Sequence, residues 1–200
     1  MKMARRVEVE ITPGACISWA LMLLILPLRW VLGVILAAAI HELWHYAAIR
    51  LCGGDVFGIR IRAGGAVMLT APQTGGRELL CAAAGPFGSF SLLLAAKYLP
   101  VTAVCGLVQG MFNLLPLFPL DGGRILRGGI EILFPNDSAR VSACAESACM
   151  VLISAAVIYG VIRTGISVLA LILGAVLVLK LLRQKNTLQR FQTKGTIETD

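Results

Sequence analysis

Apolar residues fill most of this chain in long runs, and the polar residues between them fall in short clusters. A helix needs about 20 mostly apolar residues to span a membrane. Runs of roughly that length cover residues 14–28, 31–51, 78–96, 101–120, 141–162 and 165–183. Pro27, Arg29 and Trp30 indicate a tight turn at a membrane interface between the first two runs. The pattern therefore predicts an all-α polytopic membrane protein with about six transmembrane helices.

Residues 55–72 break this pattern. Isoleucine and arginine alternate over residues 59–62, Gly64-Gly65 is a turn signal, and apolar residues resume over residues 66–70. Alternation on both sides of a glycine turn is typical of a β-hairpin. Residues 7–11 alternate as well and are a candidate third strand. We expect a small hairpin or sheet here at the cytoplasmic face, with an irregular loop as the alternative.

Composition and charge support a membrane location. The chain of 200 residues is 58% hydrophobic and 14% charged, whereas soluble domains carry about 45–50% apolar and about 25% charged residues. Residues 1–183 are expected to form one transmembrane core, and residues 184–200 a polar cytoplasmic tail. The composition excludes an ordinary soluble domain.

Lysine and arginine are distributed unevenly between the segments that flank these runs. They cluster in the N-terminus, in the second and fourth connections and in the tail, and each remaining connection has a single one: Arg29, Lys97 and Arg163. Because cytoplasmic segments are rich in Lys and Arg, both termini are expected in the cytoplasm. The net charge of +7 then reflects topology and contact with anionic lipid, and we expect no nucleic-acid partner.

The chain has two histidines, His41 and His45, and with Glu42 they form H-E-x-x-H. Residues four apart share one face of a helix, so both imidazoles can hold one metal ion. Glu42 can then reach a metal-bound water as general base. Residues 31–40, just before the motif, carry no polar side chain. We expect a metal site inside the membrane, since histidines that merely join two helices would leave Glu42 unexplained.

The third ligand cannot be a histidine, because none remains. Asp121 is the best candidate, and a turn at the membrane interface is its alternative role. It follows Pro116 and Pro119 and precedes Gly122-Gly123, and broken backbone at membrane depth is tolerated where it lines a cavity. Glu146 is the second choice of ligand.

The side chain of Asn113 is compatible with two different roles. Its amide can donate a hydrogen bond to a substrate carbonyl or its oxyanion, or it can join two helices.

These motifs resemble the site-2 protease family of intramembrane zinc metalloproteases, peptidase family M50. The likeness rests on H-E-x-x-H at residues 41–45 and on N-x-x-P-x-x-x-L-D-G at residues 113–122, and Gly85-Pro86 and Gly64-Gly65 also fit. Within the family, the ending N-L-L-P-x-x-P-L-D-G-G is most similar to stage IV sporulation protein FB. The resemblance covers residues 7–183. Neither the CBS domain usual in that sporulation protein nor a PDZ insertion is expected within these 200 residues.

The resemblance implies one Zn²⁺ per chain, bound by His41, His45 and Asp121, with Glu42 as the catalytic base. It implies that Asn113 and the hairpin at Gly64-Gly65 help to hold substrate. The implied activity is cleavage of a membrane-associated or transmembrane protein, such as a pro-sigma factor or an anti-sigma-type regulator. A membrane inhibitor protein is a possible partner, and the location would be a bacterial cell membrane.

Other functions use similar residues. A prenyl-protein-type membrane protease also carries H-E-x-x-H but takes a glutamate as third ligand. A zinc transporter or sensor would use the histidines as a transit site, and an inactive relative would bind substrate without cutting it.

Overall fold

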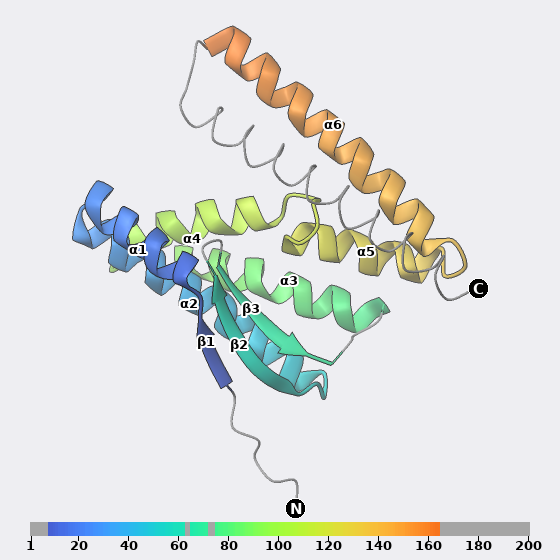
Figure 1. Cartoon of the computed structure of the whole chain (residues 1–200), viewed down its shortest axis with the longest axis horizontal. Coiled ribbons are helices and arrows are strands. Elements are labelled where there is room, and N and C mark those ends of the chain that lie inside the picture. The colour runs from blue at the N-terminus through green and yellow to red at the C-terminus, as the bar shows by residue number, and fades with distance from the viewer. Residues whose placement is uncertain (1–7, 63–64, 72–74, 165–200) are drawn as a thin grey trace, which may run out of the picture. The chain divides into compact units, whose positions relative to one another are not determined.

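The structure is a computed structural model that describes residues 8–62, 65–71 and 75–164 (Figure 1). The chain divides into two compact units, Met1–Ala143 and Cys144–Asp200. All residues of the candidate site described below belong to the first unit. The expected sixth span, residues 165–183, and the expected tail, residues 184–200, lie outside the described residues.

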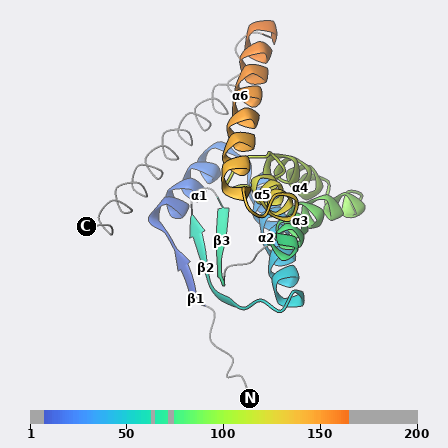
Figure 2. The same ribbon diagram turned by 90° about the vertical axis from the view of Figure 1, so that its right-hand side faces the viewer.

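Three short strands form one sheet in the order β1-β2-β3 (Figure 2). The strand β2, Val56–Arg62, pairs antiparallel with β3, Gly65–Thr70, and parallel with β1, Glu8–Ile11. Parallel pairing requires a long connection, which two helices provide here. The register sets Glu10 beside Arg60, whose Nε donates to Glu10 Oε2 at 2.6 Å. The predicted hairpin and its third strand are confirmed.

Six α-helices make up most of the described chain. Between β1 and β2 come α1, Pro13–Ile25, and α2, Leu28–Leu51; after the sheet come α3, Gly75–Ser91, the short 3₁₀ turn η1, Leu92–Ala95, and α4, Pro100–Asn113. Residues 114–120 connect α4 to α5, Asp121–Leu133, and residues 134–137 connect α5 to α6, Ser138–Thr164. Proline opens α1 and α4, where its missing N–H costs no helix bond.

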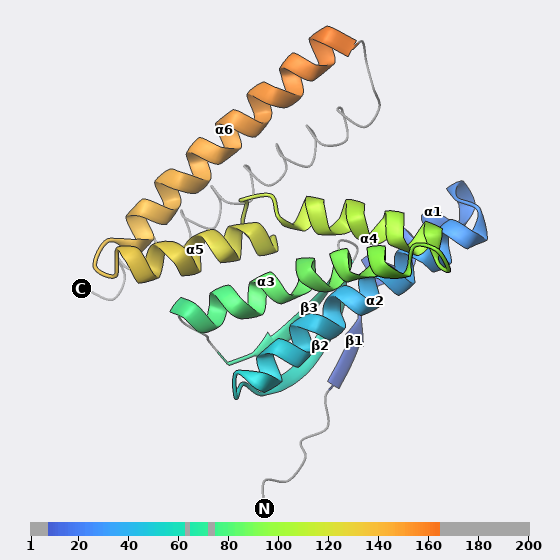
Figure 3. The same ribbon diagram turned by 180° about the vertical axis from the view of Figure 1, so that it is seen from behind.

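The helices α2 and α3 are central to the first unit. Helix α3 packs against α2, α4 and α5, and α2 also packs against α4. Viewed from opposite sides, α2 lies across one face of the sheet (Figures 1 and 3). Ile49 of α2, Val56 of β2 and Cys81 of α3 form the buried apolar cluster at this junction. The sheet is thereby fixed at one end of the helix that carries H-E-x-x-H.

The expectation of six spans needs correction in two places. The fourth run was expected over 101–120 with its helix interrupted at the two prolines; α4 already ends at Asn113, and residues 114–120 form an irregular loop. Pro116 and Pro119 cause this, because proline cannot donate a helix hydrogen bond and disfavours helix in the residue before it. Helix α5 was not predicted, since its glycines and arginines do not resemble a span.

Three of the described helical segments are long and apolar enough to cross a membrane: Leu28–Leu51, Gly75–Ala95 and Ser138–Ala156. Helix α1 is apolar but has only 13 residues. Large apolar side chains such as Leu24, Leu43 and Leu94 lie exposed on the helices, as is expected where lipid is the solvent. The chain is therefore a multi-pass membrane protein with a small three-stranded sheet.

Gly123 allows α5 to start against the loop that precedes it. A Cβ atom at this position would lie 2.4 Å from the carbonyl carbon of Leu117 and from the backbone N of Phe118. We expect Gly123→Ala to lower the thermal unfolding temperature of the detergent-purified protein, because both clashing atoms are backbone. Gly129→Ala is the matched control on the same helix, with nothing within 4 Å, and should be neutral or stabilising by up to about 1 kcal/mol. Equal stability of the two variants would contradict this packing.

Candidate metal centre

His41 and His45 lie one turn apart on α2, and both imidazoles are buried. Their Nε2 atoms are 3.2 Å apart, and the rings meet edge to face. Both residues continue the helix that the apolar residues before them begin. Their four-residue spacing places both side chains on the face toward α3.

Helix α3 orients both histidines through their Nδ1 atoms. His45 Nδ1 lies 2.7 Å from the carbonyl oxygen of Cys81. A carbonyl can only accept, so Nδ1 carries the hydrogen and Nε2 keeps a lone pair. His41 Nδ1 lies 2.8 Å from Oγ of the fully buried Ser89. Histidines that bind metal usually donate their other N–H to a partner of this kind.

Asp121 completes the group from the start of α5. Its Oδ2 lies 3.1 Å from His41 Nε2 and 3.2 Å from His45 Nε2, and the residue is buried. Three lone-pair atoms therefore converge, which is unfavourable away from water unless a positive charge lies between them. One shared proton can bridge only two of them, whereas a metal ion can bind all three. A tetrahedral ion with bonds of about 2.0–2.1 Å would separate its ligands by about 3.3–3.4 Å, close to the spacing seen.

This group is the metal-capable cluster of the part of the chain that the structure describes. Glu146, the other candidate for third ligand, lies in α6 and is not a member of it. The residues present thus fit a metal ion with two histidines and one carboxylate, and they leave room in the coordination sphere for water or substrate.

Glu42 follows His41 on α2 and is half-buried. Its carboxylate lies within electrostatic range of His41, His45 and Asp121. A base that acts on a metal-bound water must lie near the metal ligands, and Glu42 meets that condition.

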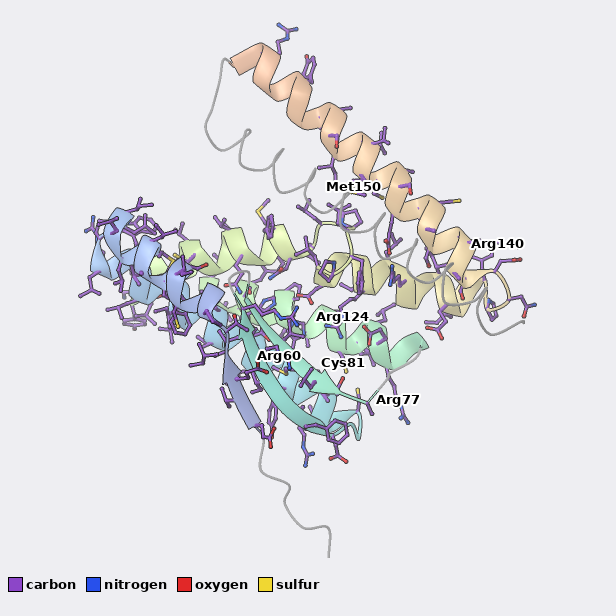
Figure 4. The ribbon with its side chains drawn as sticks, viewed as in Figure 1. Arg60, Arg77, Cys81, Arg124, Arg140 and Met150 are labelled. Carbon is purple, nitrogen blue, oxygen red and sulfur yellow. The ribbon has the colours of Figure 1, made fainter. Side chains whose placement is uncertain are left out.

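Arg124 lies on α5 one turn after Asp121 (Figure 4). Burial alone would lower the pKa of its guanidinium, but the hydrogen bond and the negative charge of Glu78 raise it above its usual value. Arg124 therefore stays cationic beside the centre.

Asn113, at the last position of α4, lies at the centre itself. Its Nδ2 is 3.3 Å from His41 Nε2. An amide N–H can only donate, so this contact also requires a lone pair on His41 Nε2. Of the two hairpin glycines, Gly65 opens β3 with φ of 124°, a backbone that favours glycine. Gly64 lies outside the described residues.

Ser89, the Cys81 carbonyl and Gly85 were not predicted as parts of the site. A Cβ atom on Gly85 would lie 2.1 Å from His45 Nε2 and 2.8 Å from His41 Cε1. Gly85 therefore provides the space that the two imidazoles occupy. Cys81, Gly85 and Ser89 are four residues apart, and this spacing is the signal that could have identified the face of α3 that meets the histidines.

Two comparisons of the sequence with known proteins found similar peptidases. Residues 89–156 match the model of Peptidase family M50, a range that contains Asn113 and Asp121 but not the two histidines. A zinc metalloprotease of Methanocaldococcus jannaschii is 31% identical over 127 residues, which cover 56% of this chain and 34% of that protein. The match thus spans about a third of the curated relative.

A solved structure shows the same fold. It is the site-2 protease from Methanocaldococcus jannaschii, with a TM-score of 0.59 and 22% sequence identity, and the match covers 90% of this chain and 89% of that one. The sequence matches thus show similarity to M50 peptidases, and the structural match shows the fold of a site-2 protease. The sporulation protein named above remains a finer resemblance.

The space at Gly85 can be tested through metal content. We expect Gly85→Ala to lose bound divalent metal, because the new methyl group would displace His45 Nε2. Gly76→Ala on the same helix is the matched control, since nothing lies within 4 Å of its Cβ position, and it should retain metal. Metal per protein is measured by elemental mass spectrometry after purification. Full metal content in Gly85→Ala would contradict the geometry described here.

Proposed function

We propose that this chain belongs to peptidase family M50 and is an intramembrane zinc metalloprotease that hydrolyses peptide bonds of membrane-associated or transmembrane proteins. One observation carries the proposal: three buried lone-pair atoms, from His41, His45 and Asp121, converge beside the carboxylate of Glu42. A metal ion can bind the three lone-pair atoms, and hydrolysis of a peptide bond gives the Glu42 carboxylate a role as base.

The bound ion would be held by His41 Nε2, His45 Nε2 and Asp121 Oδ2. When bound, Zn²⁺ lowers the pKa of a coordinated water and polarises the scissile carbonyl. The Cys81 carbonyl keeps His45 in the tautomer that presents Nε2, and Ser89 Oγ can accept the N–H of His41 Nδ1 and so allow the same tautomer there. The apolar helices around the centre exclude bulk water, which strengthens each of these interactions.

Glu42 would move the protons of the reaction. It accepts a proton from the attacking water and returns it to the amine that leaves. Its place on α2, one residue after His41 and half-buried, keeps it near the ligands without joining them.

Asn113 would hold the substrate carbonyl. Its Nδ2 lies 3.3 Å from His41 Nε2, so when an ion occupies that lone pair the amide N–H would be free to donate to a carbonyl oxygen beside the centre. Donors placed where negative charge develops are worth several kcal/mol in such reactions.

The sheet would hold the substrate backbone. A transmembrane substrate must unwind before its carbonyls are accessible, and an unwound segment can pair with a sheet edge. Strand β3, which begins at Gly65, is at an edge of the sheet order β1-β2-β3, and Gly64 and Gly65 are the proposed substrate-binding glycines of the hairpin. Helix α2 lies against this sheet and carries the centre.

The finer assignments rest on sequence likeness and charge. A pro-sigma factor or an anti-sigma-type regulator is the proposed substrate, as for stage IV sporulation protein FB, with a membrane inhibitor protein as regulator. The distribution of Lys and Arg supports cytoplasmic termini, and the likeness to the sporulation protein supports a bacterial cell membrane. Residues 1–183 would form the membrane core and residues 184–200 the tail.

The mechanism is tested with Glu42→Gln. We expect this variant to keep zinc, since Glu42 is not a ligand, and to lose at least about 100-fold in cleavage rate. The measurement is processing of a co-expressed membrane-associated pro-sigma factor, followed by immunoblot. Cleavage by Glu42→Gln at the wild-type rate would refute the protease mechanism, and zinc flux in liposomes that survives the substitution would favour a transporter.

The third ligand is tested with Asp121→Asn, paired with Glu146→Gln. The first should lose both zinc and cleavage, because the amide is a poor zinc ligand. The second should keep both. The reverse result would favour a prenyl-protein-type protease, in which a glutamate is the third ligand.

A further inference from the structure

The two carboxylate oxygens of Asp121 face different groups. Oδ2 faces both histidine Nε2 atoms, while Oδ1 lies 3.7 Å from a terminal nitrogen of Arg124, three residues later on α5. A carboxylate turns readily about its last torsion. Without a partner for Oδ1, either oxygen or both could approach an ion held by the histidines.

Arg124 is itself held from a second helix. Its Nε donates to Glu78 Oε1 at 2.7 Å, and Glu78 lies in the first turn of α3. The two side chains are 30% and 22% exposed, whereas the similar pair Arg50–Asp55, also at 2.7 Å, is 52% and 53% exposed. The Glu78–Arg124 pair is therefore shielded from solvent and is not an ordinary surface ion pair.

The position of Glu78 relates this pair to the other two ligands. Glu78, Cys81, Gly85 and Ser89 follow each other at intervals of three and four residues, so they share one face of α3. Ser89 contacts His41, the Cys81 carbonyl contacts His45, and Gly85 leaves room for both. Glu78 reaches the remaining ligand through Arg124.

We propose that Arg124 is a positioning residue for Asp121 and that Glu78 anchors it. The guanidinium attracts Oδ1 and leaves Oδ2 as the single oxygen presented to the ion. A planar guanidinium suits this task, because it can face two carboxylates in a fixed geometry, whereas a lysine ammonium is a point charge on a flexible stem. This proposal rests on the proposed metal centre.

A purely structural role makes a different prediction. The pair also joins α3 to α5, so its loss could lower stability without any effect on the ion. The two roles separate when metal affinity and thermal stability are measured on the same samples.

The experiment uses the full chain, purified in detergent, as wild type and as Arg124→Gln, Glu78→Gln, Arg124→Lys and the double variant of Arg124→Gln with Glu78→Gln. Zinc affinity is measured by competition with a chromophoric chelator, and ligand geometry by the visible absorption of the cobalt-substituted protein. Arg50→Gln, which breaks the exposed pair, is the matched control. Thermal unfolding is recorded for every sample.

We expect Arg124→Gln to weaken zinc binding by about 10- to 100-fold and to change the cobalt spectrum, as is typical when a ligand loses its partner. Glu78→Gln should change the zinc affinity and the cobalt spectrum in the same direction. The double variant should bind zinc no more weakly than Arg124→Gln alone. Arg124→Lys should not restore wild-type affinity, and Arg50→Gln should match wild type.

Wild-type zinc affinity and an unchanged cobalt spectrum in Arg124→Gln would overturn the positioning role and leave the metal centre intact. If that variant does not fold, the same outcome in Glu78→Gln overturns it. A wild-type protein that binds no zinc would instead refute the proposed function as well.

Discussion

The first unit is organised around three buried atoms that repel one another unless a cation lies between them. The Nε2 atoms of His41 and His45 and Oδ2 of Asp121 are 3.1–3.2 Å apart. In an environment of low dielectric such an arrangement is costly, and the fold nevertheless builds it from two helices that are far apart in the chain. Gly85, Gly123 and the break in the helix at residues 114–120 allow these three atoms to come together.

Helix α3 supplies no ligand, yet the centre depends on it. It provides a carbonyl and a hydroxyl for the imidazoles, a glycine where a side chain would clash, and Glu78 for the arginine beside Asp121. Partners of metal ligands commonly set tautomer and orientation in this way. Their placement on one rigid helix means that a shift of α3 would disturb all three ligands together.

The sheet is packed directly on the two helices that carry and orient the histidines. It packs on Ile49 near the C-terminal end of α2 and on Cys81 of α3, the residue whose carbonyl holds His45. A strand added at its edge would therefore be fixed relative to the metal ligands rather than to a mobile loop. Asn113, at the end of α4, also lies against His41, so under the proposed function the backbone of a bound peptide and its scissile carbonyl would be held by different elements.

Sequence alone determined the features that depend on local spacing and composition. The membrane character, the hairpin with its third strand and the grouping of H-E-x-x-H with Asp121 follow from periodicity, from glycine and proline positions and from the absence of a third histidine. Sequence predicted a break at Pro116 and Pro119 but not the exact end of α4 at Asn113, and it did not predict the helix α5 or the roles of Ser89, Gly85 and Glu78. Those depend on which helices are neighbours, and the hydrogen bonds that orient a ligand join residues 36 to 48 positions apart. No local pattern encodes such contacts, so only the tertiary structure decided how the ligands are held.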